Sequence, residues 1–159
     1  MKQKLKKGIK YVVLLLIVSI IGVLSFVSFA LPEVGEPENL KVELTPERIE
    51  RGKYLANSVS SCMDCHSARD WTKFAGPLGE GTLGKGGEEF NQEFGLPGKF
   101  FAKNITPFAL KDWSDGELLR AISSGVNKDG KALFPLMPHP SYGKMDKEDL
   151  YSIIAYLRT

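Results

Sequence analysis

One uncharged stretch divides the chain into two parts with different surroundings. From Tyr11 to Leu31 the sequence has 21 residues without a charge and without a polar face. At about 1.5 Å per residue, a helix of this length spans roughly 30 Å, the thickness of the hydrocarbon core of a membrane. A core helix of a soluble domain would keep one polar face. The sequence therefore predicts a transmembrane anchor over residues 11–31.

The charges beside this stretch predict its orientation. Five lysines and no acidic residue precede it: Lys2, Lys4, Lys6, Lys7 and Lys10. Positively charged flanks stay in the cytoplasm, so residues 1–10 are predicted as a cytoplasmic tail and the remainder as exported. A cleaved signal peptide is the alternative, with small residues Ser28 and Ala30 before a cleavage site. The stretch exceeds the usual apolar region of about 7–15 residues, which favours an anchor.

The exported part is predicted as an acidic, proline-containing linker over 32–44 and one domain over 45–159. Its sixteen basic residues against nineteen acidic ones argue against non-specific nucleic-acid binding, which needs a clustered basic face. Two cysteines are too few for a disulfide scaffold. The expected location is the cytoplasmic membrane of a bacterium, crossed once, with the domain on the periplasmic side.

Three helices are predicted in this domain from their capping residues. Thr45-Pro46-Glu47 begins the first, which should end near residue 57 or 58. Ser114 and Glu117 form a capping box before the second, and Gly125 can end it. Asp146 begins the third, whose apolar stripe comprises Leu150, Ile153, Ile154 and Leu157.

The long segment between the first two helices lacks a regular pattern. Residues 67–112 contain many glycines and six phenylalanines, and no strand pattern is evident anywhere. A loop of this length is uncommon unless it is functional or packs on a large object. Three short helices also supply little apolar surface for about 115 residues. We therefore expect something other than side chains to fill the middle of the domain.

The string Cys62-Met63-Asp64-Cys65-His66 indicates what that object is. In an exported protein, C-x-x-C-H is typical of a c-type haem attachment site. Two thiols three residues apart on a helical turn face one way and can bond the two vinyl groups of one porphyrin. The adjacent histidine can then reach the iron. The motif occurs once, so one covalent haem c is predicted.

Three other sites compete with this interpretation. A structural disulfide would leave the histidine unexplained. A thioredoxin-like redox pair would need a preceding strand and a βαβ setting. A zinc site could use Cys62, Cys65, His66 and His139, but the usual spacing of paired histidines is absent.

The chain also resembles class I cytochrome c domains, and is most similar to the haem domains of membrane-bound dehydrogenase cytochrome subunits and of related single-haem, membrane-anchored cytochromes. The matching strings are RGKYLANSVSSCMDCH, NITPFALKDWSDGELLRAI and GKALFPLMPHPSYGKMDKEDLYSIIAYLRT, which cover most of residues 50–159. The resemblance implies an all-α cytochrome c fold around haem, with the first and last helices crossing at right angles. Gly52 and Tyr54 would then lie where the first helix meets Tyr156 and Leu157.

The sixth iron ligand must come from elsewhere in the chain. Met137 lies in Leu136-Met137-Pro138, which is similar to the family's ligand loop, and nearby prolines stiffen that loop. The alternatives are His139, Met145 and an open site. His139 stands where relatives often have tyrosine.

Three further residues are predicted near the haem. The resemblance implies that the Pro77 carbonyl accepts the Nδ1–H of His66, with a plain turn as the alternative. Asn104 and Trp113 are candidates for hydrogen bonds to a propionate, and core packing is the alternative for Trp113.

The predicted function is one-electron transfer, because a His/Met-ligated haem leaves no open site for a substrate. The protein is then an electron carrier or an electron-transfer subunit rather than an enzyme, with dehydrogenase or oxidase subunits as redox partners. The alternative is a haem enzyme or sensor with an open sixth site, of a peroxidase-like or gas-binding kind, in which His139 would be the distal acid–base group. A subunit whose haem is mainly structural is a further possibility.

Overall fold

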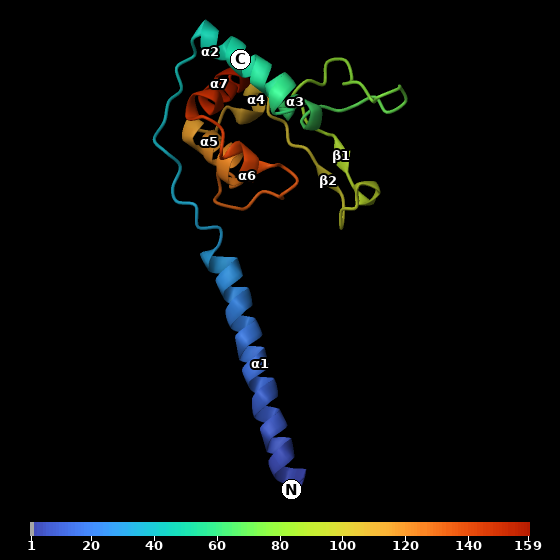
Figure 1. Ribbon diagram of the computed structural model, residues 1–159, viewed down its shortest axis with the longest axis vertical. Helices are drawn as coiled ribbons and strands as arrows, with labels where there is room; N and C mark the ends of the chain where they lie inside the picture. Colours follow the sequence, from blue (N-terminus) through green and yellow to red (C-terminus); the bar gives the residue numbers. More distant parts are fainter. Residues whose placement is uncertain (1) are drawn as a thin grey trace. The chain divides into compact units, whose positions relative to one another are not determined.

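A computed structural model describes residues 2–159 of the chain. It forms two compact units, of which the first ends at Gly35 and the second runs from Glu36 to Thr159. In the first unit, α1 (Lys2–Ala30) is one long helix (Figure 1). Its span Lys6–Ala30 is long and apolar enough to cross a membrane, and none of it is buried against the protein. This helix is compatible with the predicted anchor over 11–31.

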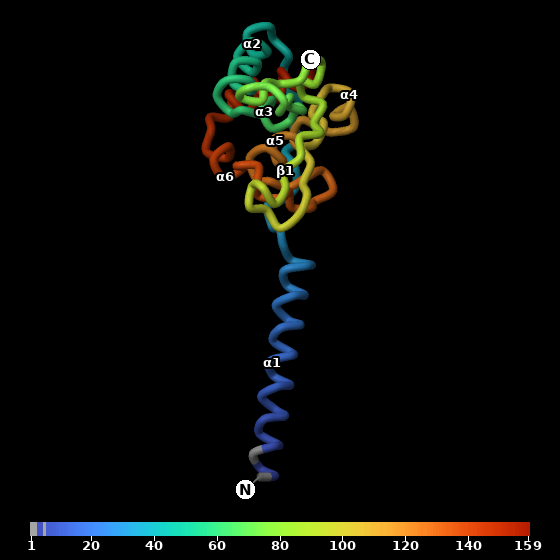
Figure 2. Tube along the Cα trace, turned by 90° about the vertical axis from the view of Figure 1, so that its right-hand side faces the viewer, coloured from blue at the N-terminus to red at the C-terminus, as the bar shows by residue number. Residues whose placement is uncertain are grey.

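The second unit contains three longer helices and several short ones (Figure 1). The longer ones are α2 (Pro46–Tyr54), α5 (Asp115–Ser124) and α7 (Lys147–Leu157). A π-helical turn, η1 (Leu55–Val59), continues α2, and the single-turn elements are α3 (Cys62–Cys65), η2 (Gln92–Phe94), α4 (Pro107–Leu110) and α6 (His139–Tyr142). Figure 2 shows the long, mostly helix-free path between α3 and α4.

The predicted helix starts are confirmed by their caps. The Thr45 hydroxyl accepts the Arg48 N–H at 3.2 Å. Ser114 and Glu117 form both hydrogen bonds of a capping box, at 3.1 and 2.7 Å. Gly125 ends α5 with φ of 67°, a left-handed conformation that glycine adopts without steric cost.

The core lies where α2, α5 and α7 meet. Gly52 allows the backbones of α2 and α7 to touch, because a Cβ there would lie 1.8 Å from the Ser152 carbonyl oxygen and 2.9 Å from the Tyr156 Cβ. Tyr54 is exposed. The helices bury a common apolar cluster: Val42, Leu55, Ala56, Met63, Leu110, Leu118, Leu119, Ile122, Leu150, Ile153, Ile154, Ala155 and Leu157.

A small β-ribbon departs from the predicted all-α fold. Strand β1 (Glu89–Phe90) pairs antiparallel with β2 (Phe100–Phe101), so that Phe90 lies opposite Phe100. The prediction of no strand was wrong here, because strands of two residues are too short to show an alternating pattern.

The last part of the predicted linker packs on the domain. Residues 36–44 form no helix or strand, but Val42 is buried and its N–H donates to the Asp115 carboxylate at 2.8 Å. Gly116 lies directly against the backbone of Glu38, since a Cβ there would meet its carbonyl oxygen at 1.8 Å. These residues therefore belong to the second unit, whereas the sequence predicted a linker over all of 32–44.

Candidate haem-binding site

The two cysteines lie on one short turn, α3. Ser61 precedes this turn in a left-handed conformation, and the His66 N–H closes it by donating to the Cys62 carbonyl at 2.9 Å. Met63 is buried in the core and fixes the turn, while Cys62 is half-buried and Cys65 exposed. Both cysteines are free. One turn therefore carries both free thiols, and that of Cys65 is the more exposed.

His66 is held in one tautomer. Its Nδ1 lies 2.7 Å from the backbone carbonyl oxygen of Lys103. A carbonyl can only accept, so Nδ1 carries the proton and Nε2 has a free lone pair. Burial lowers the pKa of His66 and favours the neutral ring, although the bond to Lys103 opposes this shift. A neutral imidazole with its second nitrogen so bonded is the form that binds metals.

The structure differs from the sequence prediction for Pro77. Its carbonyl accepts the Asp70 N–H at 2.8 Å, within the turn around Gly76, and the carbonyl on His66 is that of Lys103. The predicted bond from His66 to Pro77 is thus corrected to one from His66 to Lys103. The physical reason is that the Pro77 carbonyl is already bonded to Asp70 within its own loop, while the Lys103 carbonyl lies at the ring.

Met137 lies on the loop that joins α5 to α6, and His139 is the first residue of α6. Met137 is partly buried and packs against the core. The His139 ring rests on Gly125, where a Cβ would meet its ring atoms at 2.7–2.8 Å, and its Nδ1 lies 3.0 Å from the Met137 carbonyl oxygen. His139 therefore braces the Met137 loop against the end of α5. Met145 packs on the core, 3.9 Å from the Ser60 hydroxyl.

Asn104 and Trp113 have other partners among the described residues. The Asn104 side-chain oxygen accepts the backbone N–H and the hydroxyl of Thr106, at 2.9 and 2.7 Å. Trp113 packs against the apolar core. The suggested propionate contacts stay predictions.

The alternative sites find less support. Within residues 2–159, no group of three or more His, Cys, Asp or Glu side chains is placed to hold a metal ion. Burial raises the pKa of Cys62 to about 11, and that of Cys65 is also raised mainly by burial. A redox-active dithiol instead needs a thiol of lowered pKa.

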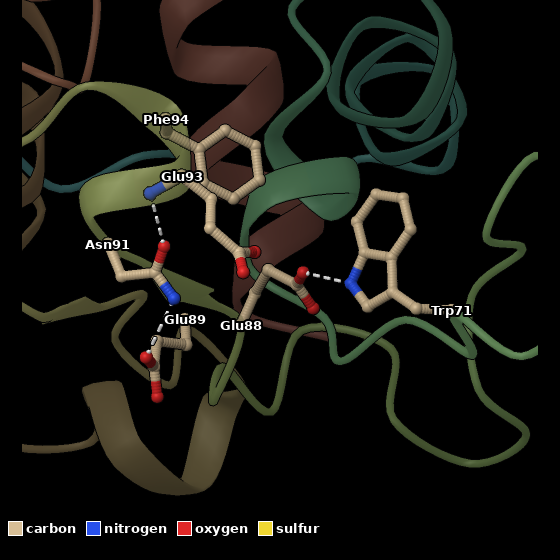
Figure 3. A pocket seen from close by; sticks show the side chains of 6 residues that line it. All are labelled: Trp71, Glu88, Glu89, Asn91, Glu93 and Phe94. Carbon is tan, nitrogen blue, oxygen red and sulfur yellow. Dashed lines mark hydrogen bonds between the residues drawn. The ribbon is translucent and has the colours of Figure 1, made fainter.

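Figure 3 shows a separate pocket. The buried Glu88 is among its lining residues, and its carboxylate accepts the Trp71 indole N–H at 2.7 Å and the Arg69 backbone N–H at 2.9 Å. The complete lining is Trp71, Glu88, Glu89, Asn91, Glu93 and Phe94, which includes none of the predicted haem-binding residues.

Sequence reasoning missed two contributors to the site. Lys103 acts through its backbone carbonyl, which leaves no signal in the residue type. Tyr142, on α6, donates to the Ser60 carbonyl oxygen at 2.6 Å, just before the cysteine turn. A partly buried tyrosine usually has a hydrogen-bond partner, but that partner can be identified only from the fold.

Comparison with known proteins shows which sequences the chain is similar to. No protein-family model matches the chain. The gluconate 2-dehydrogenase cytochrome c subunit of Pantoea cypripedii is 30% identical over 140 residues, which cover 86% of this chain and 26% of that protein. The cytochrome c subunit of the alcohol dehydrogenase (quinone) of Gluconacetobacter polyoxogenes is 31% identical over 68% of this chain and 21% of its own length. The fructose dehydrogenase cytochrome subunit of Gluconobacter japonicus is 30% identical over a stretch that covers 70% of this chain and 21% of that protein.

These likenesses define the class of protein as a c-type cytochrome. The chain carries a cytochrome c domain similar to those of dehydrogenase cytochrome c subunits, which supports haem binding and electron transfer. It spans about a quarter or less of the length of these relatives. The residues present fit a haem, because two free thiols adjoin a histidine whose Nε2 is unprotonated and has no hydrogen-bond partner in the described part of the chain.

Proposed function

We propose that this protein is a membrane-anchored cytochrome that holds one covalent haem c and transfers single electrons between redox proteins. The observation that carries the proposal is the turn Cys62–His66, in which His66 Nδ1 donates to Lys103 and Nε2 remains available for iron. The same turn holds both free thiols. A structural disulfide or a redox dithiol would use the two thiols and leave His66 without a role.

Cys62 and Cys65 would bind the haem covalently. Each S–H would add across one vinyl group, so that sulfur bonds to one carbon and hydrogen to the other, without net oxidation or reduction. His66 would bind the iron through Nε2, and Met137 would supply the second iron ligand from the chain. When bound, haem supplies a one-electron Fe(III)/Fe(II) couple. The chain's own part is to fix both ligands and keep water and substrates from the iron.

The partners follow from the relatives. Their names describe cytochrome subunits of dehydrogenases for gluconate, alcohol and fructose. We propose that this cytochrome likewise exchanges electrons with a dehydrogenase or oxidase subunit, and that residues 11–31 keep it at the periplasmic face of a bacterial membrane. Affinity purification from detergent-solubilised membranes should then recover a redox enzyme. Recovery of the cytochrome alone, with no redox partner that reduces or oxidises it, would contradict this role.

Mass spectrometry of the denatured protein tests the haem itself. Protein matured with the cytochrome c assembly machinery should gain about 616 Da, the mass of one haem held by two thioethers. The variant Cys62→Ser/Cys65→Ser should lack the added mass, and Asp64→Ala, on the same turn, should retain it. Matured wild-type protein without the added mass would refute the proposal.

A further inference from the structure

We propose that Gly86, supported by Ser67, is a positioning residue that holds the Lys103 carbonyl on His66 and thereby sets the reduction potential of iron bound there. This inference rests on the proposed function, since it concerns the iron that His66 would bind. Neither residue touches the haem-binding atoms directly. Both act through the backbone layer that brings Lys103 to the imidazole.

Residues 84–88 form the middle layer of this arrangement. On one side, the Gly86 N–H donates to the His66 carbonyl at 2.7 Å, and the Gly84 N–H donates to the Ser67 hydroxyl at 3.0 Å. Ser67 is fully buried, so this bond is shielded from water. The middle layer is therefore fixed relative to His66 itself.

The other side of the same layer holds the segment that carries Lys103. The Gly87 N–H donates to the Ala102 carbonyl at 3.0 Å, and the Ile105 N–H donates to the Gly84 carbonyl at 2.8 Å. The Ala102 N–H donates to the Glu88 carbonyl at 3.0 Å. These bonds flank Lys103 on both sides, so its carbonyl cannot shift without disturbing them.

Gly86 sets the separation between the two outer layers. A Cβ at this position would lie 2.5 Å from the Ala102 oxygen, 2.6 Å from the Lys103 carbonyl carbon and 2.7 Å from the Asn104 nitrogen. The contact is therefore with the very peptide group whose oxygen lies 2.7 Å from His66 Nδ1. A side chain at position 86 must therefore displace this peptide group, and we expect its carbonyl to move away from the imidazole.

The direction of the effect follows from the electronics of the ring. A hydrogen bond from Nδ1–H to a carbonyl increases the electron density that the imidazole gives to a metal, which favours the more positive Fe(III). Moving the Lys103 carbonyl away weakens this bond and favours Fe(II). The reduction potential should then rise, with a tenfold change in the equilibrium corresponding to about 59 mV for a one-electron couple.

The test compares Gly86→Ala with Gly87→Ala in full-length, haem-loaded protein. Both positions have positive φ, 71° and 94°, so alanine strains the backbone at each. Only position 86 lacks space, because a Cβ at Gly87 meets no atom within 4 Å. Redox titration and exchange of the His66 Nδ1 proton with D2O, followed by ¹H–¹⁵N NMR, are the two readouts.

Gly86→Ala should raise the potential and accelerate exchange of the Nδ1 proton, while Gly87→Ala leaves both near wild type. Equal effects of the two variants, or none at Gly86, would overturn the inference. If Gly86→Ala fails to mature, Ser67→Ala provides the test. It should raise the potential and accelerate exchange of the Nδ1 proton. Wild-type values of both in Ser67→Ala would overturn the inference. Failure of the proposed function is distinguished beforehand, because wild-type protein would then lack the covalent haem mass.

Discussion

Tyr142 donates its phenolic hydrogen bond to the backbone carbonyl oxygen of Ser60 across 2.6 Å. The two residues are 82 positions apart, and they join α6, which follows the Met137 loop, to the residues that lead into Cys62. The Ser60 side chain also reaches the Met145 sulfur at 3.9 Å. The contact thus connects the segment of the proposed sixth ligand with the haem attachment turn.

Removing the Tyr142 hydroxyl should destabilise the protein in a pH-dependent way. Burial is the main reason that the pKa of Tyr142 is raised from 10.0 to about 12. The folded state therefore holds this proton more tightly than the unfolded state, and the contribution to stability is complete below pH 10 and lost as the pH rises through 12. Tyr142→Phe should cost about 1–2 kcal/mol at pH 8, because the Ser60 carbonyl loses its partner.

The measurement is the free energy of unfolding of the wild type and Tyr142→Phe between pH 8 and pH 12. The difference between them should shrink across the upper part of this range. The exposed Tyr54 offers a matched control, since Tyr54→Phe should change stability little at any of these pH values. A constant difference for Tyr142→Phe across the range would contradict the assigned role of the buried hydroxyl.

Gly52→Ala should weaken the packing of α2 on α7. Alanine normally stabilises a helix by about 1 kcal/mol relative to glycine. Here its methyl group would overlap the Ser152 carbonyl oxygen, and the helices would have to separate. We expect a net loss of at least about 3 kcal/mol in denaturant unfolding of the haem-loaded protein. Lys53→Ala, at the next, exposed position, should change stability by no more than about 0.5 kcal/mol, and an equal loss there would show that the contact is not the cause.

Asp115 should be important for holding residues 36–44 on the domain. Its carboxylate accepts from the Val42 N–H at 2.8 Å and from Arg158 at 2.7 and 2.9 Å, and both side chains of this ion pair are largely buried. Asp115→Ala leaves a buried cation and a buried N–H without that partner. We expect a loss of about 3 kcal/mol in the free energy of unfolding and faster hydrogen exchange at the Val42 amide.

The exposed ion pair between Glu38 and Lys147, 2.9 Å apart, provides the comparison. Glu38→Gln should cost less than about 1 kcal/mol, because solvent screens a pair of this kind. If Asp115→Ala and Glu38→Gln lowered the free energy of unfolding equally, burial would not explain the contribution of the Asp115 ion pair.

The membrane anchor is tested by extraction and by the mature N-terminus. Alkaline carbonate should leave the full-length protein in the membrane pellet, because the apolar span Lys6–Ala30 has no protein partner that buries it. A form in which a cleavable export signal replaces residues 1–31 should be found in the soluble periplasmic fraction with its haem. Recovery of periplasmic protein that begins at Leu31 would show that the segment is a cleaved signal instead.

The parts of the fold that sequence predicted are those with local signals. Thr45, Ser114 and Gly125 mark helix ends through hydrogen bonds or φ values that involve only a few neighbouring residues, and each prediction is confirmed. The apolar stripe of α7 is likewise buried, because a period of 3.6 residues is visible in the chain itself.

The parts that sequence could not predict depend on contacts between distant segments. Lys103 is identified only by where its carbonyl lies. The sequence predicts Pro77 instead, because Gly76-Pro77 resembles a family pattern. Val42 is buried because the segment around it packs on the domain: Glu38 lies against Gly116, and the Val42 N–H bonds Asp115. The acidic sequence around Val42 does not indicate this packing. Each of these contacts spans 37 residues or more, beyond the range of periodicity or capping rules.

The identity of the sixth ligand decides between an electron carrier and a protein with an open iron site. If Met137 binds through sulfur, the oxidised protein should show the weak absorption band near ~695 nm that is typical of methionine ligation. Met137→Ala should abolish the band, lower the reduction potential and let cyanide or carbon monoxide bind. Met145→Ala should keep the band and cost about 2–3 kcal/mol, since Met145 packs against the core.

His139→Ala separates bracing from ligation. Its ring rests on Gly125 and its Nδ1 lies 3.0 Å from the Met137 carbonyl oxygen, so its loss should loosen the loop without removing the sulfur. We expect the band to be present in the cold. On heating, it should disappear at a lower temperature than in the wild type. A band that survives Met137→Ala, together with a spectrum that changes in His139→Ala already at low temperature, would assign the iron to His139 instead.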